Sequence, residues 1–112
     1  MFIIYHNPKC SKSRATLALL EEHTDEFEIV EYLKNPLNID DLKALSKKLG
    51  KAPSEFYRSK ESIIQDENIN VSSDDKVLEA MVKYPKLMER PIVISGDRAI
   101  IGRPPENVKE LF

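Results

Sequence analysis

The spacing of apolar and polar residues predicts a strand, a helix and a second strand at the start of the chain. Residues 2–5 form a short apolar run, which is typical of a buried strand. Residues 11–23 are good helix formers. Residues 27–33 alternate between apolar and polar, with Phe27, Ile29 and Leu33 on one face, as a strand does. A strand–helix–strand unit of this length is normally parallel and right-handed.

The pattern then changes, and residues 36–84 read as a helical insertion. Asn38 is a good helix cap, leucines recur on one face after it, and Gly50 stops the helix. A short helical piece is predicted over residues 54–58, so that it ends at an arginine. Residues 72–84 predict a further helix, because serines precede a run of apolar pairs four residues apart.

The strand pattern returns near the end of the chain. Residues 91–95 and 98–101 predict an antiparallel pair joined by a turn at Gly96. Residues 106–112 predict a last helix, with Val108 and Leu111 facing inward. The order predicts an α/β fold, namely a mixed sheet flanked by helices, in a single domain over residues 1–112.

Composition narrows the class of protein. The chain has 112 residues, 41% of them hydrophobic and 32% charged, which suits one globular domain with a modest core. A net charge of −2 gives no basic field, so we expect neither nucleic acid nor a membrane as partner. The apolar start is too short for a signal peptide. A single cysteine suits a reducing cytoplasm, and with two scattered histidines it predicts no metal site.

The candidate chemistry lies between the first strand and the first helix. Cys10 is expected at the helix N-terminus, where free N–H groups and the helix dipole bind anions and lower the pKa of a thiol. A lone cysteine is often a small buried hydrophobe, but polar and basic flanks disfavour that alternative here. The flanking residues are His6, Asn7, Pro8, Lys9, Ser11, Lys12, Ser13 and Arg14.

Arg58, Arg90 and Arg103 are candidates for holding an anion near this cysteine. An arginine stays charged and donates paired hydrogen bonds to a tetrahedral oxyanion. Arg90 precedes Pro91, and such a bond can be cis, which would present the arginine at the end of the sheet. The alternative for each arginine is a solvated surface position. The sequence alone does not bring the three together.

These motifs resemble those of the ArsC-type arsenate reductases, which are glutaredoxin-dependent enzymes with a thioredoxin-like fold. The likeness covers essentially the whole chain and is carried by residues 6–14, Tyr32-Leu33, the helical insertion, residues 89–93 and residues 102–104. The Cys-Ser-Lys-Ser-Arg form is similar to a short branch of that family.

The resemblance implies roles for particular residues. Cys10 would be the nucleophile, and His6 would help to lower its pKa. Arg58, Arg90 and Arg103 would bind arsenate, with a cis bond between Arg90 and Pro91. The supporting residues would be His6, Asn7, Ser11, Lys12, Ser13, Arg14 and Pro91. Glutathione would be a co-substrate and glutaredoxin a partner, with no bound cofactor.

Two departures keep other functions open. The best-known members carry a cysteine just before the last Arg-Pro pair, where this chain has Ile101-Gly102. Spx-type regulators share the fold and bind RNA polymerase, but usually carry Cys-x-x-Cys where residues 7–10 read Asn-Pro-Lys-Cys. A regulator of that kind, or a general glutathione-linked thiol oxidoreductase, therefore remains an alternative.

The cysteine count also restricts the mechanism. Reducing arsenate to arsenite takes two electrons, and two thiols supply them as they join in a disulfide. With one cysteine in the chain, the second thiol must come from outside. We therefore expect glutathione with glutaredoxin to serve as reductant, and thioredoxin alone to serve poorly.

Overall fold

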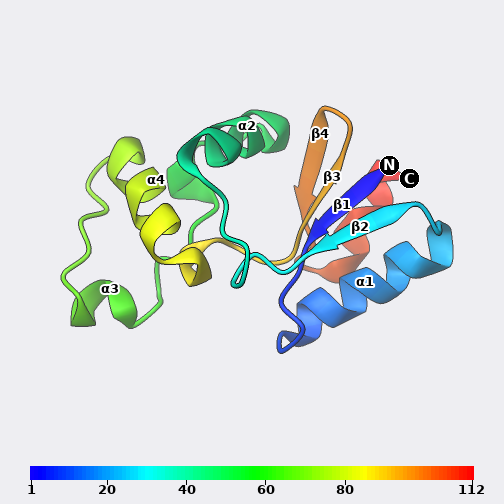
Figure 1. Cartoon of the computed structure of the whole chain (residues 1–112), viewed down its shortest axis with the longest axis horizontal. Helices are drawn as coiled ribbons and strands as arrows, with labels where there is room; N and C mark the ends of the chain where they lie inside the picture. Colours follow the sequence, from blue (N-terminus) through cyan, green and yellow to red (C-terminus); the bar gives the residue numbers. More distant parts are fainter. The chain divides into compact units, whose positions relative to one another are not determined.

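A four-stranded mixed sheet joins the two ends of the chain in the computed structural model, which describes residues 1–112 (Figure 1). The strand order is β2-β1-β3-β4; β1 and β2 are parallel, and β3 is antiparallel to both of its neighbours. The predicted thioredoxin-like α/β class, with a parallel start and a terminal hairpin, is confirmed. The strands are β1 (Phe2–Tyr5), β2 (Phe27–Val30), β3 (Ile92–Ser95) and β4 (Arg98–Ile101).

The chain forms two compact units: residues 1–35 together with 90–112, and residues 36–89. The first unit holds the sheet, and the second holds most of the helices. The single domain expected over the whole chain stays a prediction. None of the helices combines the length and the apolar character that a membrane span requires.

In the first unit, two helical segments cover one face of the sheet. They are α1 (Ser11–His23), which links β1 to β2, and η3 (Pro105–Leu111), which packs beside it (Figure 1). The core on this face is built from register partners in the central strands and from apolar residues of the two segments. Its buried members are Ile4, Leu20, Val93, Val108 and Leu111. This packing holds the C-terminal end of β1 in place, where the loop that leads to α1 begins.

The last segment, η3, is a 3₁₀-helix, where the sequence predicts a helix without that tighter winding. Pro104 precedes it and Pro105 begins it. In a 3₁₀-helix, residues three apart lie on one line. Val108 and Leu111 have that spacing, and both are buried as predicted.

The prediction for β2 is partly wrong. The strand ends at Val30, and the chain turns at once, with Lys34 N–H and Asn35 N–H both donating to Glu31 O at 3.0 and 2.9 Å. Phe27 packs against the core, but Ile29 on this edge strand is 45% exposed. Leu33 lies beyond the strand and is 46% exposed, so the alternation continued past the end of the sheet.

In the second unit, the predicted all-helical composition is confirmed, with only an isolated bridge between Tyr57 and Met88. Asn38 and Asp41 form a reciprocal capping box, and Gly50 ends the first helix with a φ of 67°. Ser73 caps the second of the two long helices of the unit, which covers Asp74–Lys83. The helical segments are α2 (Ile39–Leu49), η1 (Pro53–Glu55), α3 (Ile63–Asp66), α4 (Asp74–Lys83) and η2 (Pro85–Leu87).

Two details of the second unit differ from the sequence predictions. The short helix after Pro53 ends at Glu55, so Arg58 does not end it. Instead, Arg58 follows the bridge at Tyr57, and its N–H donates to Leu87 O at 2.6 Å. The single turn α3 lies where no element was predicted, because its polar sequence carries no amphipathic pattern.

Candidate active site

Cys10 lies at the N-terminus of α1, where the sequence predicted it. The chain leaves β1 and makes a turn in which Cys10 N–H donates to Asn7 O at 3.0 Å. Cys10 is the N-cap residue of α1, with extended backbone angles of φ −98° and ψ 123°. Its side chain is free of a capping bond and is partly exposed. The sulfur therefore faces the unpaired N–H groups of the first helical turn.

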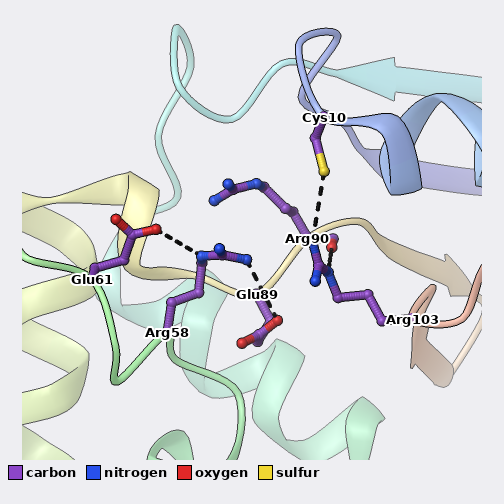
Figure 2. Close-up of polar contacts among 6 residues, drawn as sticks. All are labelled: Cys10, Arg58, Glu61, Glu89, Arg90 and Arg103. Carbon is purple, nitrogen blue, oxygen red and sulfur yellow. Dashed lines mark hydrogen bonds and ion pairs between the residues drawn. The ribbon is translucent and has the colours of Figure 1, made fainter.

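Four donors surround the sulfur of Cys10. The backbone N–H groups of Ser13 and Lys12 and the side chains of Arg90 and Arg103 each lower the pKa of its thiol. Figure 2 shows the bond from Arg103, whose Nη2 lies 3.8 Å from Sγ. Burial raises the pKa of Cys10, but these bonds outweigh burial and lower the pKa to about 7. A large share of the thiol is therefore thiolate at neutral pH, as the sequence predicted.

Arg90 and Arg103 are connected to each other as well as to the thiol. Arg103 Nε donates to the carbonyl oxygen of Arg90 at 2.9 Å (Figure 2). The Arg90–Pro91 bond is cis, as predicted, and the Arg103–Pro104 bond is cis too. Two cations thus lie beside one thiolate, which is an arrangement suited to holding an oxyanion while sulfur attacks it.

Gly102 holds the Arg103 loop against the sheet, and the sequence analysis missed it. A Cβ at this position would lie 2.5 Å from Thr16 Oγ1 and 2.9 Å from Pro91 Cγ. Gly102 N–H donates to Pro91 O at 2.9 Å, and Thr16 Oγ1 donates to Gly102 O at 3.3 Å. A glycine directly before an Arg-Pro pair was the available signal, because a close backbone approach requires glycine.

His6 acts on the site through Ser13. Its Nδ1 lies 2.6 Å from Ser13 Oγ, and Ser13 Oγ accepts a bond from Asn7 N–H at 3.0 Å. Burial lowers the pKa of His6; the charge of Glu31 raises it and that of Arg14 lowers it. The lowered pKa favours the neutral imidazole of His6, which is buried against Ser13, and the backbone N–H of Ser13 in turn helps to lower the pKa of Cys10.

The remaining basic and polar residues of the loop shape the turn. Arg14 Nη1 donates to Pro8 O at 3.0 Å, so this charge is used to hold the loop. Asn7 Oδ1 accepts from Lys9 N–H at 3.0 Å. Ser11 is the first residue of α1, and like the side chain of Lys12 it is exposed.

Arg58 belongs to the other unit and has two carboxylates around it. Its Nε lies 2.9 Å from Glu61 Oε1, and its Nη1 lies 4.0 Å from Glu89 Oε2 (Figure 2). All three side chains are about three-quarters buried, with exposures of 22–25%. Among the predicted site residues, the first unit brings together the cysteine loop, Arg90, Pro91 and Arg103. That Arg58 reaches the same anion stays a prediction.

Comparison with known proteins finds a family and relatives that match nearly the whole chain, including the site residues of the first unit. The family model described as ArsC family matches residues 5–111. The Escherichia coli protein YfgD, described as uncharacterized, is 49% identical over 111 residues, covering 96% of this chain and 93% of its own. An arsenate reductase from Haemophilus influenzae is 44% identical over 118 residues, covering 98% and 97%.

A solved structure is similar over the same length. The arsenate reductase from Vibrio cholerae superposes with a TM-score of 0.92 at 43% identity, covering 99% of this chain and 97% of its own. The family match spans the whole site, from the cysteine loop to the Arg103 loop. The chain belongs to the ArsC family.

Proposed function

We propose that this protein reduces arsenate to arsenite, with Cys10 as the nucleophile. The observation that carries the proposal is the Cys10 thiol at the N-terminus of α1, with Arg103 Nη2 3.8 Å from its sulfur and with Arg90 and Arg103 helping to lower its pKa to about 7. Relatives named arsenate reductase, at 43–44% identity over nearly the full chain, support the choice of oxyanion.

In the first step, Cys10 thiolate attacks arsenic and a sulfur–arsenic bond forms. One arsenate oxygen takes up protons and leaves as water, so arsenic remains pentavalent. Arg90 and Arg103 neutralise the remaining oxygens, and Arg58 is the third cation of the proposal. Because the donors are held before substrate arrives, little reorganisation accompanies the attack.

The second thiol comes from glutathione, because the chain has only one cysteine. Glutathione thiolate attacks the Cys10 sulfur of the adduct, and the sulfur–arsenic electron pair passes to arsenic, which leaves as arsenite. The products balance as arsenic(III) and one Cys10–glutathione mixed disulfide. Glutaredoxin then resolves that disulfide by thiol exchange and frees Cys10. The proposed location is a reducing cytoplasm, where glutathione is kept as a thiol.

The test is arsenate-dependent NADPH consumption with glutathione, glutathione reductase and glutaredoxin. We expect turnover in that mixture and little turnover with thioredoxin, thioredoxin reductase and NADPH alone. Cys10→Ser should remove turnover in both. Efficient turnover with the thioredoxin system alone would overturn the glutathione assignment, and activity in Cys10→Ser would overturn the nucleophile.

The same reagents separate the alternatives. A regulator of the Spx kind would keep its partner binding in Cys10→Ser and would show no arsenate-dependent turnover in the wild type. A general thiol oxidoreductase would reduce glutathione mixed disulfides without competition from arsenate or phosphate. The proposal requires arsenate-dependent turnover that phosphate inhibits.

A further inference from the structure

A hollow of about 290 Å³ lies where β1 and β2 end, on the first unit. It is lined on one side by loop residues 6–9, directly before the cysteine, and on the other by Glu31, Leu33 and Lys34. The carboxyl ends of parallel strands are a common place for ligands in α/β folds. We propose that this hollow binds the glutathione that supplies the second thiol, an inference that rests on the proposed function.

The charges of the hollow complement those of glutathione. At neutral pH the tripeptide carries two carboxylates and one ammonium group, while the hollow offers the ammonium groups of Lys9 and Lys34 and the carboxylate of Glu31. Lys34 Nζ lies 3.6 Å from Glu31 Oε1, and their side chains are 76% and 38% exposed. Such an exposed pair is weak, so both groups are free to turn to a charged ligand.

The hollow also has an apolar surface for the uncharged part of the tripeptide. Leu33 is 46% exposed at its edge, although it is a large hydrophobic residue, and Pro8 lies on the loop side. An exposed leucine and a proline between charged groups match the methylene groups of the γ-glutamyl arm. Ligand sites commonly combine apolar walls with a few placed charges in this way.

A tripeptide in the hollow is long enough to reach Cys10. The loop wall and the cysteine are the two ends of one turn, closed by the bond from Cys10 N–H to Asn7 O. The Cα atoms at the ends of such a turn are less than about 7 Å apart. An extended tripeptide spans about 10 Å. The thiol is on the central residue, roughly half that length from either end, so glutathione held at the loop wall of the hollow can bring its thiol to the sulfur of Cys10 across the turn.

His6 offers a reporter for this binding. It lines the hollow, is buried, and bonds Ser13 Oγ at 2.6 Å. A ligand bound in the hollow would change the environment of the His6 imidazole without contacting Arg90 and Arg103, which hold the anion. The site can thus be observed without turnover.

The first experiment is a titration with S-methylglutathione, which binds but lacks a free thiol, followed by NMR in a buffer without phosphate. We expect shifts confined to residues 6–10 and 31–34, including the His6 imidazole. Lys34→Glu should weaken the binding roughly fivefold or more, because one attraction becomes a repulsion. Shifts located elsewhere, or no saturable shift, would overturn the proposal.

The second experiment measures turnover. Lys34→Glu and Lys9→Glu should each raise the KM for glutathione roughly fivefold, and Lys34→Glu, which lies outside the cysteine loop, should leave the KM for arsenate unchanged. The matched control is Lys76→Glu in the second unit, which breaks an exposed pair of the same spacing with Glu79 at 3.2 Å. An equal rise in the KM for glutathione in Lys76→Glu, or no rise in Lys34→Glu and Lys9→Glu, would overturn the proposed binding site.

Failure of this inference is distinguishable from failure of the proposed function. If wild-type turnover does not need glutathione, the proposed function fails, whatever the titration shows. If turnover needs glutathione and neither lysine variant alters its KM, only the hollow is wrong.

Discussion

The two arginine clusters of Figure 2 use the same side chain in different ways. In the first unit, Arg103 contacts a thiol and a backbone carbonyl, and neither of these groups is a carboxylate. In the second unit, Arg58 contacts the carboxylates of Glu61 and Glu89. Arg90 and Arg103 bring two positive charges to one thiolate, so net positive charge remains for an incoming anion, whereas the two carboxylates around Arg58 outweigh its single charge.

The difference lies in what positions each guanidinium group: uncharged groups position Arg103, and carboxylates position Arg58. Arg103 is positioned by a backbone carbonyl and by a loop packed through Gly102, and neither of these carries a charge that offsets that of the guanidinium. Arg58 is held by ions, so an anion must share the guanidinium with two carboxylates. Removing Arg103 should therefore lower activity more than removing Arg58.

The largest expected effect is that of Arg103→Ala. The kcat/KM for arsenate should fall by roughly a hundredfold or more, because one fixed donor to the developing charge is lost. Arg58→Ala should lower kcat/KM by a smaller factor, on the order of tenfold, since its charge is shared. Steady-state kinetics with glutathione and glutaredoxin in excess measures both.

The control for that comparison is Arg98→Ala. Arg98 is an exposed arginine of the same unit, and its Nη2 donates to Glu110 O at 3.1 Å, away from the cysteine loop. We expect unchanged kinetics. If Arg58→Ala loses as much activity as Arg103→Ala, the contrast between the two clusters is wrong.

Gly102→Ala tests whether packing alone places Arg103. The added methyl group would lie 2.5 Å from Thr16 Oγ1, and overpacking of this kind costs about 1–3 kcal/mol in unfolding free energy. Activity should fall by roughly tenfold as the loop moves. Urea denaturation and kcat/KM are the measurements.

A second substitution makes the glycine test specific. Two of the three nearest atoms to the added Cβ belong to Thr16, so Thr16→Ala removes both. Gly102→Ala with Thr16→Ala should recover part of the lost stability and activity relative to the sum of the single changes. Strict additivity would mean that the close contact with Thr16 does not matter.

The pH dependence of alkylation separates the two arginines without turnover. The iodoacetamide rate should rise with pH as the thiolate forms and reach half its maximum near pH 7, the pKa of Cys10. Arg103→Ala removes one of the bonds that lower this pKa, so the midpoint should move up and the rate at pH 7 should fall roughly threefold.

Arg58→Ala should leave the alkylation midpoint in place. The hydrogen bonds that lower the pKa of Cys10 come from Ser13, Arg90, Arg103 and Lys12, all in the first unit. An equal shift in both arginine variants would show that the two clusters act on the thiol alike.

The smallest expected effect comes from freeing Arg58 of its carboxylates. Glu61→Gln should tighten competitive inhibition by phosphate about twofold at low salt, because a negative charge is removed. Glu89→Gln should do less, since its oxygen is 4.0 Å from Arg58 Nη1 whereas that of Glu61 is 2.9 Å from Nε. Stability should change by less than about 1 kcal/mol. Weaker inhibition would show instead that Glu61 positions the guanidinium.

Local signals account for what could be predicted from the sequence. The capping residues Asn38 and Ser73 and the turn at Gly96 act within a few residues, so their pattern is visible in the chain itself. The place of Cys10 follows in the same way, because a strand and a helix flank it closely. The placement of Arg90 and Arg103 beside Cys10 was predicted from the family motifs, because no local pattern shows that these residues approach it.

The missed features depend on parts of the chain that are far apart. The close packing of Gly102 depends on Thr16, 86 residues away, so nothing beside the glycine reveals it. The early end of β2 depends on which neighbours its edge position provides. His6 was expected to help lower the pKa of Cys10, which stays a prediction, but the contact of its Nδ1 with Ser13 Oγ could not be predicted from the sequence. Arg58 fell in a stretch whose helical pattern stops at Glu55, before the residue is reached.

The unit that carries Cys10 is discontinuous in sequence, and this has a consequence for synthesis on the ribosome. Residues 1–35 emerge first, but β3 pairs with β1, and Arg90 and Arg103 arrive only with residues 90–112. Until then the nascent chain lacks the central partner of β1 and both guanidinium groups that lower the pKa of Cys10. Since chains emerge at about 5–20 residues per second, the cysteine spends several seconds without the groups that make it reactive. The order of synthesis thus leaves the thiol less acidic, and so less nucleophilic, until residues 90–112 complete the fold.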